Sequence, residues 1–169
     1  MICRRSFLAD ASALALVLAA GQARAQAIWT DWRGSKFGTR IEYPSDLFAI
    51  QPEPDAQDGR TFAAADGAQI AAYGVFNDVV DFESAIAATT EGDAYSQVTY
   101  RRRHSGWAVV SGIRPIDGRP SVFYERYFLD PRKDVYHVVV MTYPTEAKAT
   151  YDPIVRRIAG SLDSSRYTR

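Results

Sequence analysis

The chain has two histidines, His104 and His137, so a histidine-based metal site or a serine triad would have to use one of them. His137 lies in an apolar run between Val135 and Val139, where it could act as a ligand or a base. Its nearest acidic neighbour along the chain is Asp134. These surroundings favour a histidine held by one hydrogen bond inside the core or at its edge.

A basic cluster forms the most distinctive candidate for surface recognition. Arg101, Arg102, Arg103 and His104 end one expected strand, and Trp107 begins the next. The arginines could dock an anionic protein partner or the head groups of an envelope membrane, and the indole could add a flat apolar contact. Arginines on an edge strand also keep sheets from pairing edge to edge, so a purely solvated edge is the alternative. We treat these five residues as the candidate partner-binding site.

No catalytic, cofactor or metal motif accompanies this cluster. The sequence has no G-x-S-x-G elbow, no phosphate-binding glycine loop, no dinucleotide fingerprint and no H-E-x-x-H. Glu53, Asp55 and Asp58 lack the regular spacing of a calcium loop and lie among prolines, which predicts a solvated loop. Glu125 and Arg126 face opposite sides of one expected strand, so one of them needs an ion pair or a place at the sheet margin. We therefore assign no catalytic residue, no cofactor and no metal ligand.

The elements that position the basic cluster are predicted to be four consecutive strands. Residues 98–103, 107–113, 121–129 and 135–143 have the composition of strands, with turn residues between these runs. The last run is apolar on both of its faces, which is typical of a strand covered on both sides. We expect a meander in which this last strand lies at the centre of the sheet.

Three further strands are expected before the meander. Residues 37–43 read as a strand ended by Pro44, which has no amide to donate to a ladder. Residues 61–65 and 69–76 flank Asp66-Gly67, a dipeptide suited to a tight hairpin turn.

Two helices complete the prediction. Asp81 is placed to cap the first, which should end by Gly92. After Pro144 the chain is predicted to turn helical around Ala147, and Asp152 and Pro153 are predicted as the cap and the first residue of the second helix. The apolar stripe expected on the second helix consists of Ile154, Val155, Ile158, Ala159 and Leu162. The residues after it, 164–169, read as a polar tail.

The first 25 residues predict export. Arg4 and Arg5 precede an apolar run over residues 11–20, and Ala23-Arg24-Ala25 resembles a cleavage site. The apolar run is too short for a membrane span, which needs about 20 residues. The segment Arg4-Arg5-Ser6-Phe7-Leu8 resembles a twin-arginine signal, and the general secretory route remains the alternative. We expect cleavage near Ala25 and a periplasmic or secreted single domain over residues 26–169.

Composition excludes several classes of protein. The single cysteine, Cys3, lies in the export segment, so the mature chain should have no disulfide and no thiolate chemistry. Removal of residues 1–25 takes away three basic residues and one acidic residue, leaving 17 basic and 19 acidic residues. A slightly acidic chain argues against general nucleic-acid binding, which needs a basic surface.

The order of elements and several short segments resemble the Mog1/PsbP-like superfamily, in particular its small exported bacterial members of unknown function. The segments are Phe37-Gly38, Ile41-Glu42-Tyr43-Pro44, Phe62 with Asp66-Gly67, Tyr73-Gly74, Val122-Phe123-Tyr124-Glu125, Thr142-Tyr143-Pro144 and Tyr151-Asp152-Pro153-Ile154-Val155. The resemblance covers nearly the whole mature chain. It implies an α+β fold in which an antiparallel sheet of six or seven strands is sandwiched between helices. No functional residue of a named member matches a position here.

These observations favour an exported, non-enzymatic binding or accessory protein that acts through a protein or envelope partner. The alternatives are a small periplasmic hydrolase that uses carboxylates with His104 or His137, and a carrier with an apolar cavity lined by aromatic residues. Each alternative requires a concave site that the sequence does not reveal. The oligomeric state is not indicated by the sequence.

Overall fold

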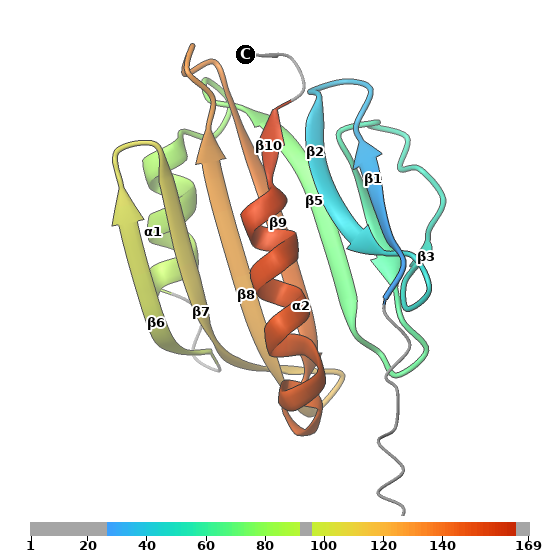
Figure 1. Cartoon of the computed structure of the whole chain (residues 1–169). Coiled ribbons are helices and arrows are strands. Elements are labelled where there is room, and N and C mark those ends of the chain that lie inside the picture. Colours follow the sequence, from blue (N-terminus) through green and yellow to red (C-terminus); the bar gives the residue numbers. More distant parts are fainter. Residues whose placement is uncertain (1–26, 92–95, 165–169) are drawn as a thin grey trace, which may run out of the picture.

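The computed structural model describes residues 27–91 and 96–164, which form two antiparallel sheets and two α-helices. The predicted export segment and the tail beyond Ser164 lie outside the described residues. Figure 1 shows the large sheet between helix α1 on one side and helix α2 with the small sheet on the other.

The large sheet has seven strands in the order β3-β4-β5-β9-β8-β7-β6. All of its neighbouring strands are antiparallel. Its strands are β3 (Ala49–Ile50), β4 (Gly59–Ala63), β5 (Gln69–Phe76), β6 (Gln97–His104), β7 (Trp107–Ile116), β8 (Arg119–Leu129) and β9 (Val135–Pro144). Strand β9 is central, and β6 to β9 follow one another as the expected meander. The predicted α+β architecture and strand number are confirmed.

The small sheet has three strands in the order β1-β2-β10. They are β1 (Trp29–Arg33), β2 (Thr39–Pro44) and β10 (Asp163–Ser164). The sequence prediction contained β2 but neither β1 nor β10. Only Trp32 is buried in β1, so this strand shows no alternation of apolar and polar residues.

Two apolar cores lie on opposite faces of the large sheet. The first packs α2 and the small sheet against the sheet, and Ile41, Phe62, Met141 and Ile158 are fully or nearly fully buried within it. The second packs α1 (Phe82–Glu91) against the other face through side chains that include Phe82. Strand β9 contributes to both cores, as its apolar pattern predicted.

Helix α1 begins as the sequence predicted. The Asp81 carboxylate accepts a hydrogen bond from the Ser84 amide at 2.9 Å. It also accepts one from the Ser84 hydroxyl at 2.5 Å. These bonds satisfy a free amide in the first turn, and the helix extends to Glu91.

Helix α2 (Lys148–Ser161) begins where the chain was expected to turn helical, but it overturns the roles predicted for Asp152 and Pro153. It begins five residues before Pro153, directly after a 3₁₀ turn (Thr145–Ala147), so Pro153 lies inside the helix. Asp152 accepts hydrogen bonds from the Tyr143 hydroxyl at 2.9 Å and the Lys148 ammonium at 3.2 Å, and it caps no helix. The helical turn before Pro153 carries the Tyr151 ring into the core, where it is 3% exposed. Burial of this ring favours the early start of the helix.

None of the helices in residues 27–91 and 96–164 is both long and apolar enough to span a membrane.

Candidate partner-binding face

The large sheet separates the five predicted site residues onto two faces. Arg101 and Arg103 stand opposite Val110 and Ala108 of β7 and lie on the side of α1, where Arg103 forms an ion pair with Glu83. Arg102 and His104 alternate with them and lie on the side of α2, as does Trp107. The basic cluster is therefore two separate sets of residues, and only one contains the indole.

Strands β6, β7 and β8 leave part of the sheet uncovered on the side of α2. Helix α2 runs over β9 and β8, and no element of Figure 1 lies over β7 and β6 on this side. The ladder register places on this surface, which we call the open face, side chains that include Tyr100, Arg102, His104, Trp107, Val109, Ser111, Tyr124, Arg126 and Phe128. Val109 at its centre is 5% exposed, so the long side chains beside it shield it from water.

Trp107 contacts three cationic or polar side chains of this surface. The guanidinium carbon of Arg102 lies 5.6 Å from its ring centroid, and that of Arg126 lies 5.5 Å away. The imidazole of His104 stacks on the indole with 11° between the planes and 6.0 Å between centroids. The two arginine contacts are within the range of cation–π attraction. This attraction holds both arginines over the sheet without neutralising their charge.

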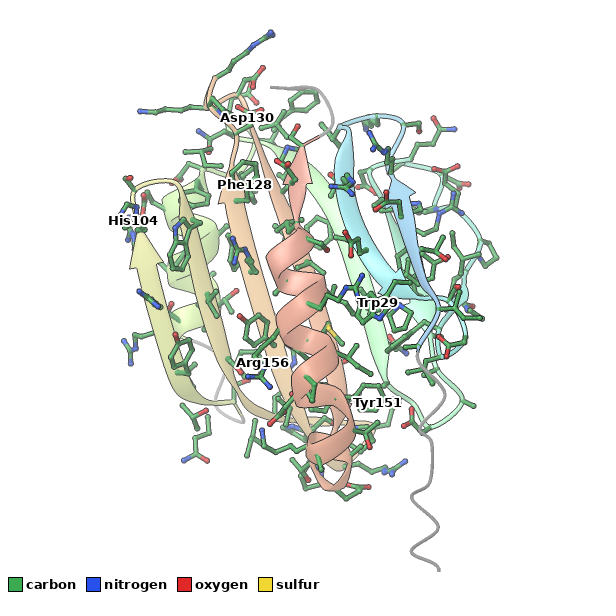
Figure 2. The ribbon with its side chains drawn as sticks, viewed as in Figure 1. Trp29, His104, Phe128, Asp130, Tyr151 and Arg156 are labelled. Carbon is green, nitrogen blue, oxygen red and sulfur yellow. The ribbon has the colours of Figure 1, made fainter. Side chains whose placement is uncertain are left out.

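The positive charge of the open face is not balanced locally. Within the described ranges, neither Arg102 nor Arg126 forms an ion pair, and the same holds for Arg156 of α2. Arg156 lies on the side of α2 that borders the open face, and His104 lies at the far corner of that face (Figure 2). A guanidinium remains charged at every physiological pH, so the open face attracts anions throughout that range.

Glu125 does not compensate this charge because it points to the opposite side of β8. Its carboxylate accepts hydrogen bonds from the Tyr127 hydroxyl at 2.6 Å and the Thr89 hydroxyl at 3.1 Å. The guanidinium of Arg114 lies 3.5 Å from its other oxygen. Glu125 is therefore paired in the interior, as expected from the sequence, while Arg126 stays on the open face.

A groove of about 430 Å³ lies between α2 and the open face. Tyr100, Ser111 and Tyr124 line its sheet side, and Lys148 and Arg156 line its helix side. Burial raises the pKa of the Tyr124 phenol despite the nearby Arg126 guanidinium, so this hydroxyl keeps its proton at neutral pH. The groove therefore offers hydroxyl donors and cationic groups together.

The two histidines lie in different surroundings. His137 is fully buried, and its Nδ1 lies 2.8 Å from the Thr39 hydroxyl oxygen, which confirms the interpretation of a core histidine. His104 is exposed and contacts Ser105, with 3.3 Å between the ring nitrogen and the hydroxyl oxygen. Neither of these two contacts is with a carboxylate, whereas the hydrolase hypothesis required a histidine–carboxylate pair in a concave site. In the described parts of the chain, no group of three or more metal-ligating side chains occurs.

Sequence reasoning missed Arg126, Tyr124 and Arg156 as members of the surface. Tyr124, Arg126 and Phe128 are two residues apart along β8 and therefore lie on the same face of the sheet. Phe128 pairs with Trp107 of β7. That signal can be read only when the register between strands is known. Arg156 comes from a helix that the sequence alone does not place beside β7.

Comparisons with known proteins place this domain among small α+β proteins. No protein-family model matches the chain, and no curated protein matches it in sequence. The Ran-binding protein Mog1p of Saccharomyces cerevisiae superposes with a TM-score of 0.56 at 8% identity, covering 82% of this chain and 96% of that one. Cyanobacterial PsbP from Synechocystis sp. PCC 6803 gives 0.52 at 12% identity, covering 87% and 98%.

A third similar structure is LpqN of Mycobacterium tuberculosis, described as involved in cell envelope biogenesis. It gives a TM-score of 0.50 at 14% identity, covering 80% of this chain and 90% of that one. At these identities the likeness shows the fold alone. The chain has the Mog1/PsbP-like fold, which confirms the resemblance found in the sequence.

Proposed function

We propose that this chain is an exported, non-enzymatic binding or accessory domain that holds a protein or envelope partner on its open face. The observation that carries the proposal is the position of Trp107 between two arginines that form no ion pair with described residues, on a sheet surface that neither described helix covers. Tryptophan and arginine are the residue types that contribute most to binding energy at protein interfaces.

The similar structures support a binding role by their names alone. Mog1p is a Ran-binding protein, and LpqN is linked to the cell envelope. The fold itself does not determine a partner, so the proposal depends on the residues of the open face.

Partner capture from envelope extracts tests the site. The full chain is expressed in bacterial cells, and the purified protein is immobilised alongside two variants. We expect saturable capture that falls about tenfold or more in the double variant Trp107→Ala/Arg126→Ala. The matched control is Arg101→Ala, which removes an exposed arginine on the side of α1 and should capture as the parent does. Equal capture by the parent and the double variant would contradict the proposed surface.

Export is tested on the same expressed protein. The motivating observation is the segment Arg4-Arg5 with its apolar run and Ala23-Arg24-Ala25. Mass spectrometry of the periplasmic fraction should find an N-terminus near Gln26. The variant Arg4→Lys/Arg5→Lys should accumulate uncleaved if the twin-arginine route is used, and it should be processed normally if the general secretory route is used. Recovery of only the full-length chain from the cytoplasm would refute export.

A further inference from the structure

We propose, building on the function above, that the open face takes an extended acidic segment of a partner polypeptide, which lies in the groove beside α2 and ends on Trp107. The occupant is thus defined by its carboxylates and by its shape. Charge, surface form and length support it independently.

Charge is the first argument. Arg102 and Arg126 lie over Trp107, and Arg156 lines the groove beside them. None of the three forms an ion pair with a residue that the structure describes. The acidic side chain that lines the groove, Asp152, is already bound to Lys148 at 3.2 Å. The expected mature chain has more acidic than basic residues, so this excess of positive charge is local to the open face. Guanidinium groups bind carboxylates with two parallel hydrogen bonds, which favours an acidic ligand.

The shape of the surface favours a polypeptide over a membrane as the ligand. Helix α2 stands as a ridge along one side of the open face (Figure 1), and a groove of about 430 Å³ runs at its foot. Arg126 lies on the sheet floor, where its Nε is buried and makes no hydrogen bond with a described residue. A flat bilayer would touch exposed residues such as Tyr100 and His104 but would be held off the floor by the helix. A narrow chain can enter the groove and reach Arg126.

The length of the path from the groove to Trp107 favours a polypeptide over a small anion as the ligand. Tyr124 and Phe128 face the same side of β8, four residues apart, which corresponds to roughly 13 Å along the strand. Tyr124 lines the groove, and Phe128 stands opposite Trp107, so groove and indole together accommodate about four extended residues. A single phosphate would occupy only part of this path. The hydroxyls of Tyr100 and Tyr124 along the path can donate to the carbonyl groups of a bound chain. The Ser111 hydroxyl already donates to the Phe123 carbonyl at 2.8 Å and can accept from an amide of that chain.

The experiment uses the purified protein and a synthetic decapeptide of alternating glutamate and alanine as the probe. Binding is followed by calorimetry and by Trp107 fluorescence, with Trp107→Phe as the fluorescence control. We expect micromolar binding that weakens as salt is raised, because the contacts are ionic. Arg126→Ala and Arg102→Ala should each weaken binding about tenfold, and Arg101→Ala should leave it unchanged. Arg126→Lys keeps the charge and should retain part of the affinity, which shows that the loss in Arg126→Ala is not a folding defect.

Other outcomes overturn the inference. A peptide in which lysine replaces glutamate should not bind, and equal binding of that peptide would remove the charge argument. Binding to phosphatidylglycerol vesicles without binding to the acidic peptide would identify the face as a membrane contact. Full competition by inorganic phosphate at the same concentration would identify a small-anion site. If the acidic peptide fails while Trp107→Ala/Arg126→Ala still abolishes capture from envelope extracts, the inference fails and the proposed binding function stands.

Discussion

Thr39 and His137 lie 98 positions apart in the sequence, and their side chains meet at 2.8 Å between Oγ1 and Nδ1. Both residues are buried, with 1% and 0% of their surface exposed. Thr39 belongs to β2 of the small sheet, and His137 belongs to β9 at the centre of the large sheet. This hydrogen bond therefore joins the two sheets through the core that they share.

Replacement of Thr39 by valine should destabilise the protein by about 1–3 kcal/mol. Valine has the same shape but no hydroxyl, so the buried Nδ1 of His137 loses its Thr39 partner. Urea unfolding measures the change, and Thr30→Val is the matched control because Thr30 bonds to Ser45 at the exposed surface. The Thr30 variant should change stability by less than about 0.5 kcal/mol. If both variants lost the same free energy of unfolding, the buried bond between the sheets would contribute no more to stability than the exposed one.

Asp130, at the turn between β8 and β9, should make stability depend on pH. Its buried carboxylate accepts hydrogen bonds from the amides of Arg132 and Lys133. Burial and then the neighbouring Asp134 raise the pKa of Asp130 above its ordinary value of 3.8. A raised pKa in the folded state means that this contribution is most favourable below pH 3.8 and is lost as the pH rises through the folded pKa.

The variant Asp130→Asn should therefore be more stable than the parent at neutral pH. Asparagine keeps the oxygen that accepts from the two amides and has no charge to bury. Its advantage should vanish below pH 3.8, where the parent carboxyl is also neutral. Asp130→Ala is the comparison: it loses the two turn hydrogen bonds and should cost about 1–2 kcal/mol at both pH values. A loss of stability in Asp130→Asn at neutral pH, of the same size as in Asp130→Ala, would contradict the assignment.

Gly74 and Gly160 should respond to alanine with opposite signs. A Cβ added at Gly74 of β5 would lie 2.5 Å from the Cβ of Phe37, which is itself 4% exposed. Phe37 would have to move from its place beside Phe76, so Gly74→Ala should cost about 1–3 kcal/mol. No atom lies within 4 Å of a Cβ at Gly160 in α2, and Gly160→Ala should add about 0.5–1 kcal/mol. Chemical unfolding of the two variants decides the matter, and the same sign for both would count against the packing described around Phe37.

The sequence was most informative where local rules and the final fold agree. The meander β6 to β9 could be predicted because its runs have strand composition and are separated by turn residues. Strand β9 could be placed at the centre because both of its faces are apolar. Strand β1 could not be predicted because only Trp32 is buried in it, and β10 has only two residues.

The candidate site was predicted only in part, for a different physical reason. Arg101, Arg102 and Arg103 are adjacent in the sequence, but the alternation of a strand sends them to opposite faces. Arg126 and Arg156 join Arg102 through sheet register and helix packing, which no short sequence segment encodes. The surface is therefore a property of the tertiary fold, and its indole was the member that the sequence identified most directly.

Pro153 allows a direct test between the predicted and the observed start of α2. If Pro153 were the first residue of the helix, alanine in its place would restore no helical bond, and stability would be unchanged or slightly lower. In the structure it lies inside the helix, where residue 153 of a regular helix would donate to the carbonyl of Ala149. Proline cannot donate, and its ring crowds that carbonyl.

We therefore expect Pro153→Ala to stabilise the protein by about 1–2 kcal/mol, which is the interior cost of proline reduced by the extra entropy of the unfolded chain. Pro54→Ala, in the exposed loop before β4, is the control. It changes mainly the unfolded-state entropy and should lose about 0.4–1 kcal/mol. Hydrogen exchange adds a local readout, because the new amide at position 153 should be protected if α2 begins at Lys148. A rapidly exchanging amide at position 153, together with unchanged stability, would show that the helix begins at Pro153. Tyr151 would then have to enter the core from outside a helix.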